Sequence, residues 1–459
     1  MALRRSPFVA ARLSLGIACL AVATEVGCSD AKITDVFLVV SGDTAGWIVP
    51  CGCAARQSGG LLRRGTYVKR LGAKENVVVA DAGGAAGGVS EYHRAKFAAI
   101  LAGEMKMGID AHNIGASEVA LGIDYLRQIS RELSVPFVSA NVFDAQGKPL
   151  APAYRMVRRG GQNIFLTGVM AKRYQTAELQ VRDPQEAVLA SLQEASGKYD
   201  YAIVLAYLPE DLLRSLATSL PEVDAVVGGP TGQTVAPEKI GPTLLCSATN
   251  KGKFLALIDL PAVGKGVAGV ISEMDDSLAD DPDQLENLDQ YYERLAGRDF
   301  EADRTGFGNA SPPDAPASYR VAGTHACQQC HADDCQQWNG SKHAHAWETL
   351  VAKKAHVDPY CQQCHTTSYG LSNGFYSISK SEQRIDVGCE SCHGPSQMHV
   401  DNPRARTTFV ARDQCAGCHD RENSPAFEYT AYWNRITHGA PANGPVGEAL
   451  GDSPDSGKE

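Results

Sequence analysis

The stretch CQQCHADDC, residues 327–335, decides the character of the second half of this 459-residue chain. It holds two cysteines three positions apart, and a histidine follows the second cysteine directly. The same C-x-x-C-H pattern returns as CQQCH from Cys361, CESCH from Cys389 and CAGCH from Cys415. With 14 cysteines and 12 histidines in the chain, chance would produce only about 0.01 copies of this pattern. The four copies therefore indicate one shared chemical purpose.

C-x-x-C-H is the attachment signature of c-type haem, because both thiols can form thioethers with the haem and the histidine can bind its iron. A zinc ribbon does not need a histidine after every second cysteine, and a disulfide framework has no use for that histidine. We therefore expect four covalently bound c-type haems. The attachment cysteines are Cys327, Cys330, Cys361, Cys364, Cys389, Cys392, Cys415 and Cys418, and the proximal iron ligands are His331, His365, His393 and His419.

The region around these motifs, residues 318–440, contains few long apolar runs. Side chains alone could hardly build a core there, so we expect short helices and loops packed around the porphyrins. Each iron has one further axial position. The other histidines of the region are His325, His343, His345, His356, His399 and His438.

Three segments of this region, CQQWNGSKHAHAWETL, CESCHGPSQMHV and ENSPAFEYTAYWNRITHG, resemble the tetrahaem cytochromes of the cytochrome c-554 type, which are electron carriers. The resemblance covers about residues 318–440. It implies three distal ligands, His343, His399 and His438. His345 and His356 are weaker alternatives. His325 is so close to Cys327 in sequence that its reach toward an iron is constrained.

The resemblance also implies that one haem can be five-coordinate, namely the haem on Cys361, Cys364 and His365. An open axial position permits ligand chemistry, whereas a filled one favours electron transfer alone. The sequence thus leaves two functions open for this region, an electron carrier or a haem enzyme that acts on a small nitrogen or oxygen species.

The first half of the chain alternates between apolar, β-branched runs such as DVFLVV, NVVVAD and YAIVLAY and helical stretches such as SEYHRAKFAAILAGEMKMG. This alternation predicts an α/β domain over residues 33–275, with any site in the loops at the strand ends. A charged amphipathic helix and a Gly- and Pro-rich linker follow over 276–317, and the mostly helical haem domain occupies 318–440.

The blocks FLVVSGDTAGW, VVVADAGG, DAHNIGASEVALG, IVLAYLPE and VVGGPTG resemble the calcineurin-like metallophosphoesterases of the 5′-nucleotidase group. That resemblance implies a sandwich of two mixed sheets and a two-metal hydrolytic site. Asp43 is retained, and Asp81 remains near the position of the bridging aspartate. The other ligand positions hold Ala45, Gly84, Ala116, Ser117, Glu118, Tyr207, Pro230 and Gly232. We expect a scaffold without hydrolase activity, since too few ligands remain for a metal pair; a working phosphoesterase is the least favoured function.

The N-terminus has Arg4, Arg5 and Arg12 before an apolar stretch, which is typical of an export signal over residues 1–28. Cys28 follows Gly27 and resembles the lipidated cysteine of bacterial lipoproteins; simple cleavage and a retained anchor are the alternatives. We expect an exported protein of the periplasm or envelope surface, with a lipid anchor as its only membrane attachment and redox proteins as partners. The net charge of −10 argues against nucleic-acid binding.

The sequence has three further features that bear on surface, tail and cysteine chemistry. The basic stretch LLRRGTYVKR at residues 61–70 is interpreted as a solvated helix face, and residues 441–459 as a disordered tail. The pair Cys51 and Cys53 lies in a loop after the first strand. It is either a pair of plain loop cysteines, with a bond from one of them to Cys246 as an option, or a redox or metal site.

Overall fold

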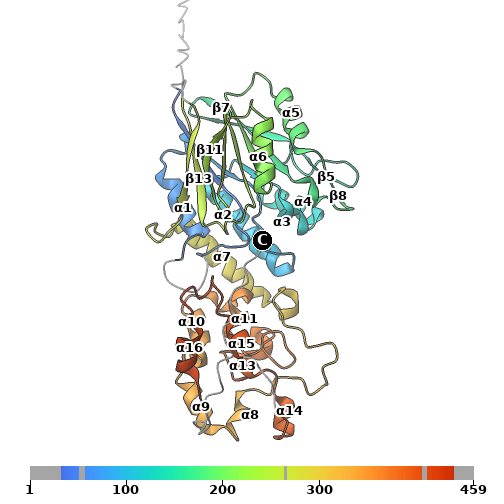
Figure 1. Cartoon of the computed structure of the whole chain (residues 1–459), viewed down its shortest axis with the longest axis vertical. Helices are drawn as coiled ribbons and strands as arrows, with labels where there is room; N and C mark the ends of the chain where they lie inside the picture. The colour runs from blue at the N-terminus through green and yellow to red at the C-terminus, as the bar shows by residue number, and fades with distance from the viewer. Residues whose placement is uncertain (1–32, 51–56, 263–265, 406–410, 439–459) are drawn as a thin grey trace, which may run out of the picture. The chain divides into compact units, whose positions relative to one another are not determined.

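The computed structural model describes residues 33–50, 57–262, 266–405 and 411–438 (Figure 1). The predictions for the export signal, for Cys28, for Cys51 and Cys53 and for the tail 441–459 lie outside these residues. From Ile33 onward the chain clusters as one compact unit. Among the described residues, no helix is both long and apolar enough to cross a bilayer.

Two six-stranded sheets form the first half of this unit. In the first sheet, β1 runs parallel to β2 and antiparallel to β13, so the sheet is mixed. Its strand order is β14 (Ala268–Glu273), β13 (Phe254–Leu260), β1 (Val36–Ser41), β2 (Val77–Asp81), β3 (Ala111–Asn113) and β4 (Phe137–Val138).

The second sheet is also mixed, because its central strands are parallel and its edge strands antiparallel. Its order is β11 (Val235–Ile240), β12 (Thr243–Ser247), β10 (Ala225–Gly229), β9 (Tyr201–Tyr207), β7 (Gln162–Met170) and β6 (Tyr154–Arg159). A small antiparallel pair, β5 (Val142–Asp144) and β8 (Leu179–Val181), stands apart from both sheets.

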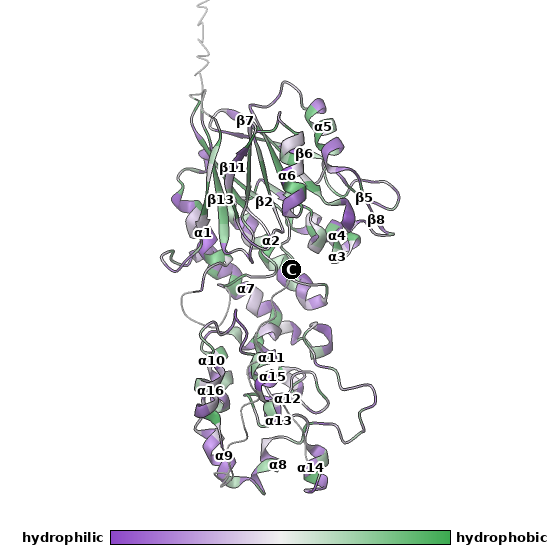
Figure 2. Ribbon diagram, viewed as in Figure 1, coloured by the Kyte–Doolittle hydropathy of each residue, from purple (hydrophilic) through white to green (hydrophobic). Residues whose placement is uncertain are grey.

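The main core lies between the two sheets, and side-chain alternation along the strands creates it. In β1, Val36, Leu38 and Val40 join the apolar cluster that includes Ile203 and Leu205 of the second sheet. The strands of both sheets are largely hydrophobic in Figure 2. Burying a side chain of this size stabilises the fold by about 1.5–3 kcal/mol.

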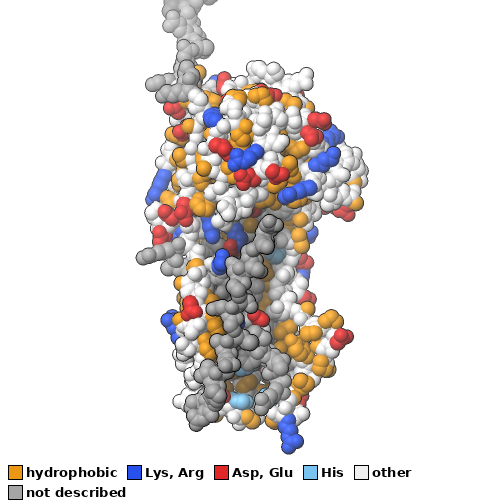
Figure 3. Space-filling model, in the orientation of Figure 1, with side chains coloured by type: hydrophobic (Ala, Val, Ile, Leu, Met, Phe, Trp, Pro, Cys, Tyr) orange, Lys and Arg blue, Asp and Glu red, His pale blue; other side chains and the backbone are white. Residues whose placement is uncertain are grey.

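Helices cover the outer faces of the sheets. Their apolar residues form separate clusters with the strands, one containing residues of α2 and α7 and another containing residues of α5 and α6. Charged side chains of both signs are interspersed on the face shown in Figure 3. The helices are α1 (Leu61–Arg70), α2 (Glu91–Met107), α3 (Ala116–Ala120), α4 (Ile123–Leu133), α5 (Pro184–Glu194), α6 (Glu210–Ser219) and α7 (Pro282–Arg298), with the 3₁₀ turns η1 (Lys74–Asn76) and η2 (Lys172–Tyr174).

The second half of the chain is built from short helices, as expected. They are α8 (Thr324–Gln328), α9 (Ala332–Asn339), α10 (Ala346–Val351), α11 (Pro359–His365), α12 (Ile378–Ser381), α13 (Glu390–His393), α14 (Gln397–Asp401), α15 (Ala411–Ala416) and α16 (Tyr429–Ile436). The 3₁₀ turns η3 (Ala302–Arg304), η4 (Lys342–His345), η5 (Ala355–Val357) and η6 (Glu382–Arg384) connect them. Helices α8, α14 and α16 contain no buried residue.

The predicted fold class is confirmed in both halves, with one local correction. The helical run from Ala116 to Leu133 divides into α3 and α4 at Gly122, whose φ is 102°, a value that favours glycine. The basic stretch at 61–70 is not simply solvated, because Arg64 is only 1 % exposed. The Arg64 side chain points inward from α1 toward Asp81 of the first sheet.

Candidate haem sites and the sheet-edge cluster

The structure brings three motif histidines face to face with three histidines from outside the motifs. His343 comes from η4 and His399 from α14, while His438 follows α16. The pairs are His331 with His399, His343 with His419, and His393 with His438, at ring-centroid separations of 6.2, 6.2 and 5.9 Å.

These separations fit one metal ion between each pair of rings. A metal bonded at about 2 Å to one nitrogen of each of two facing imidazoles holds the ring centroids roughly 6 Å apart. Direct stacking of the two rings would bring their centroids closer. Each pair also has the two cysteines of its motif beside it in sequence. The residues therefore suit a porphyrin iron that is bound from both sides.

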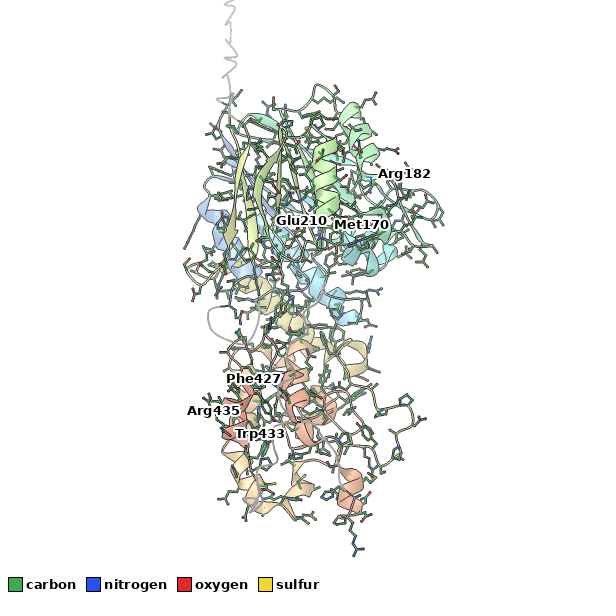
Figure 4. The ribbon with its side chains drawn as sticks, viewed as in Figure 1. Met170, Arg182, Glu210, Phe427, Trp433 and Arg435 are labelled. Carbon is green, nitrogen blue, oxygen red and sulfur yellow. The ribbon has the colours of Figure 1, made fainter. Side chains whose placement is uncertain are left out.

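The second ring nitrogen of several of these histidines is already hydrogen-bonded. Nδ1 of His399 lies 2.6 Å from the carbonyl of Ala405, and Nδ1 of His438 lies 2.9 Å from that of Ile436. Nδ1 of His419 lies 2.9 Å from the Ser424 hydroxyl. A hydrogen bond at Nδ1 fixes the ring orientation and leaves Nε2 for a metal. Phe427, labelled in Figure 4, stacks on the His419 ring at 4.8 Å.

His365 is held differently from the other motif histidines. Its Nδ1 lies 2.8 Å from the Ala346 carbonyl oxygen, as a proximal ligand requires. Among the described residues, which include every histidine of the chain, no imidazole ring is paired with the His365 ring. A haem held by His365 would therefore have one side without a histidine.

The weaker distal alternatives have other contacts. His345 is exposed, and its Nε2 lies 3.1 Å from the carbonyl oxygen of Asn339. His356 meets the Trp347 ring edge-on at 5.8 Å. The structure brings neither residue to a motif histidine.

The motif cysteines approach one another between motifs. Thiols of Cys327 and Cys389 are hydrogen-bond neighbours, and so are those of Cys364 and Cys418. Cys392 lies near Cys418 as well. The buried Cys246 forms no disulfide with another described cysteine, and its suggested partners, Cys51 and Cys53, lie outside the described residues. The first motif thus lies next to the third motif. The third motif lies next to the fourth, and the fourth lies next to the second.

Glu390, inside the third motif, was not singled out from the sequence. Its buried carboxylate accepts hydrogen bonds from the backbone N–H groups of Ala322 at 2.8 Å, Gly323 at 2.7 Å and Ser396 at 2.7 Å. It ties the segment before the first motif to the third motif. A glutamate between two cysteines carries no sequence signal for this role.

Comparison with known families agrees with this geometry. Residues 326–394 match the family model of cytochrome c554 and c-prime. Cytochrome c-554 of Nitrosomonas europaea is 32 % identical over 154 residues, which cover 26 % of this chain and 64 % of that protein. The chain thus spans less than two thirds of the length of this curated relative. The C-terminal part is cytochrome c-554-like, and the match indicates covalently bound c-type haem.

Outside the cytochrome-like part, the carboxyl ends of β1, β2, β3 and β9 meet where the resembled phosphoesterases would hold metal. Burial raises the pKa of Asp43 to about 6. The Tyr207 ring fills the space beside two glycines. A Cβ on Gly84 would lie 3.0 Å from Cε2 of Tyr207, and one on Gly115 would lie 2.5 Å from its Cδ2. The Tyr207 ring therefore occupies the space at these strand ends.

A group of buried charges, which we call the sheet-edge cluster, lies next to Tyr207. Asp81, Glu104 and His112 each present one atom suited to a metal, all within 4.8 Å of one another. However, Nη1 of Arg64 lies 3.9 Å from the Asp81 carboxylate and 3.8 Å from that of Glu104. The Arg64 guanidinium thus already supplies a positive charge beside these two carboxylates. Arg64, Asp81, Glu104, His112 and Glu118 make up the cluster.

The protonation of the cluster follows from its contacts. Burial acts to lower the pKa of His112, but the carboxylates of Glu104, 2.8 Å away, and Glu118 raise it well above its ordinary value. His112 is thus a second cation. Burial and the charge of Glu104 raise the pKa of Asp81 to about 6. Glu118 also accepts hydrogen bonds from the N–H groups of Gly84 at 3.1 Å and Ala85 at 2.6 Å.

Solved structures support the sandwich fold. A 5′-nucleotidase precursor from Thermus thermophilus aligns with a TM-score of 0.50 and 21 % identity, over 58 % of this chain and 61 % of that one. The sulfate thiohydrolase SoxB of the Thermus genus aligns with a TM-score of 0.50 and 16 % identity, over 59 % and 62 %. At these identities the likeness concerns the fold alone. The α/β metallophosphoesterase-like fold of the N-terminal part is thereby confirmed.

Proposed function

We propose that this protein is an exported cytochrome that carries four c-type haems and relays electrons between redox proteins. The observation that carries the proposal is the set of three imidazole pairs at 5.9–6.2 Å, each joining one motif histidine to one other histidine. Haem irons bound by two histidines have no open position and suit electron transfer.

In this proposal the eight motif cysteines hold the haems, the four motif histidines are proximal ligands, and His343, His399 and His438 are distal ligands. The contacts between motif thiols support a continuous relay in the order of motifs one, three, four and two. Covalent haem attachment fits the expected export, with an anchor at Cys28 as part of the proposal.

A second function is favoured by one specific observation. The ring of His365 is paired with no imidazole among the described residues, so its haem would be five-coordinate. An iron with a vacant side can bind a small nitrogen or oxygen species. In that case the other three haems would supply or remove electrons for chemistry at the second motif.

We also propose that the phosphoesterase-like domain is not a hydrolase. Tyr207 occupies the space beside Gly84 and Gly115, and Arg64 and His112 supply the positive charge of the sheet-edge cluster. The test is hydrolysis of nucleotides and simple phosphate esters with added manganese, zinc or calcium. Metal-dependent turnover that disappears in Asp43→Ala would overturn this part of the proposal.

The haem proposal is tested on the mature protein made with a competent haem-attachment system. Mass spectrometry should report four haems per chain, and the pyridine haemochrome spectrum should agree. Electron paramagnetic resonance separates the two functions, since one high-spin haem that binds nitric oxide or carbon monoxide favours the enzyme. Fewer than four haems would contradict the proposed cofactor content.

A further inference from the structure

Helix α11, which carries Cys361, Cys364 and His365, begins at a buried acid. Asp358 is its N-cap and accepts a hydrogen bond from the backbone N–H of Tyr360 at 2.9 Å. The Asp358 side chain is only 6 % exposed although it would carry a full charge. A carboxylate placed there must be stabilised by hydrogen bonds or by a nearby cation.

The other hydrogen bonds to the Asp358 carboxylate come from outside the cytochrome-like part. The Tyr92 hydroxyl on α2 donates at 2.7 Å, and the Tyr291 hydroxyl on α7 donates at 3.4 Å. Both tyrosines are buried. Burial and the charge of Asp358 raise the pKa of both phenols well above the ordinary value, so both remain neutral donors. The Asp358 carboxylate thus joins α2 and α7 to the start of α11.

Among the described residues, no lysine, arginine or histidine forms an ion pair with Asp358. Lys96 donates to the Tyr92 hydroxyl at 2.9 Å and lies over the Tyr360 ring at 5.0 Å. Lys96 is partly exposed, so water screens its charge. Burial and Lys96 lower the pKa of His93 to about 4, which leaves that ring neutral near pH 7.

Aromatic rings keep water away from the same place. Tyr360 packs edge-on against Trp47 at 5.3 Å and against Phe307 at 5.6 Å. A charge in such surroundings acts over a longer range than a charge in water. The negative charge of Asp358 is therefore felt at the start of the helix that would hold the second haem.

We propose that the buried charge of Asp358, held by Tyr92 and Tyr291, lowers the reduction potential of the haem on Cys361 and Cys364. The inference rests on the proposed haem content. A buried negative charge stabilises the oxidised iron, which carries one more positive charge than the reduced iron. The tuned haem is the one whose histidine faces no second imidazole, where the potential decides whether a ligand meets reduced iron.

The test is a redox titration of the full-length protein with all its haems, comparing wild type with Asp358→Asn. Asparagine caps a helix about as well as aspartate, so the substitution removes the charge and keeps the cap. The second haem is followed by its high-spin resonance signal. Its midpoint potential should rise while the other three stay unchanged. Asp358→Ser, which also keeps a cap, should give the same direction if Asp358→Asn folds poorly.

Two further variants separate charge from packing. Tyr92→Phe keeps the carboxylate and should not raise the potential. Asp281→Asn removes the charge of another buried N-cap aspartate, on α7, and should leave all four potentials unchanged. An unshifted potential in Asp358→Asn, or an equal rise in Tyr92→Phe, would overturn the inference while four haems are still present. Fewer than four haems in wild type would instead contradict the proposed function.

Discussion

Arg64 shows at the scale of a single residue how much one buried charge can determine. Its guanidinium lies between the carboxylates of Asp81 and Glu104 and donates to the Thr44 hydroxyl at 2.9 Å. Three elements, α1, α2 and β2, are therefore joined through one side chain. Removing this cation would leave His112 alone to compensate the buried acids of the sheet-edge cluster.

Arg64→Met should reduce the free energy of unfolding of the sandwich by about 3–5 kcal/mol, because one partner of a buried ion cluster is lost. Urea denaturation followed by circular dichroism measures the change. Arg70→Met, on the exposed end of the same helix, is the control and should differ from wild type by less than about 0.5 kcal/mol. Equal stabilities of the two variants would remove Arg64 from this role.

His438→Ala should convert one low-spin haem to high spin without releasing it, since the thioethers and His393 would still hold the porphyrin. Electron paramagnetic resonance reports the spin state, and mass spectrometry reports the retained haem. His345→Ala is a matched control, because His345 is exposed and bonded to the Asn339 carbonyl. If His438→Ala leaves the low-spin signal unchanged, His438 is not an iron ligand.

At the scale of elements, the ends of the strands explain why a hydrolytic site would be hard to restore. Gly84 follows β2 with a φ of 89°, and a Cβ there would lie 2.9 Å from the Asp43 Cα. The backbone itself thus opposes any side chain at this position. Tyr207, at the end of β9, closes the same space from the second sheet.

Gly84→Asp should therefore destabilise the domain and restore no phosphoesterase activity. The left-handed conformation alone costs about 1–2 kcal/mol for a residue with a Cβ, and the close backbone contact adds to it. Gly72→Asp is the control, since Gly72 has a φ of 115° but no heavy atom near its Cβ position. Thermal unfolding should show a larger loss for Gly84→Asp. Manganese-dependent turnover in that variant would contradict the explanation.

The same elements show what the sequence could reveal. The runs at β1, β2, β7, β9 and β10 are apolar enough to be recognised as strands. The C-x-x-C-H spacing names eight cysteines and four histidines without any structure. The burial of Arg64 could not be foreseen, because a basic helix face looks solvated until its partners on β2 and α2 are brought near. Tyr92 and Asp358 are 266 positions apart, so no local pattern joins them.

At the scale of the whole molecule, the two parts of the chain are stabilised in different ways. The sandwich has extensive apolar clusters between and outside its sheets. In the cytochrome-like part, the described residues form a small apolar cluster around Trp347 and Phe375, and α8, α14 and α16 contain no buried residue. Haem would have to supply the missing contacts.

A haem-free preparation should accordingly keep a folded sandwich and lose order after about residue 318. Limited trypsin digestion with mass spectrometry should show early cleavage near α8, α14 and α16 in the haem-free chain and protection in the complete protein. The sandwich peptides serve as the internal control. Equal protection of both parts without haem would mean that the C-terminal part folds on its own.

Because Arg64 and His112 provide positive charge from within the chain, the sandwich can finish folding without any ion from its surroundings. Such a domain would not need haem for its own folding, and Tyr92 would then be in place when helix α11 forms. The first half could then act as a template during maturation, on which the second motif is ordered while its porphyrin is being joined. A scarcity of manganese or zinc would leave that template intact, whereas a scarcity of haem would leave the second half of the chain unfinished.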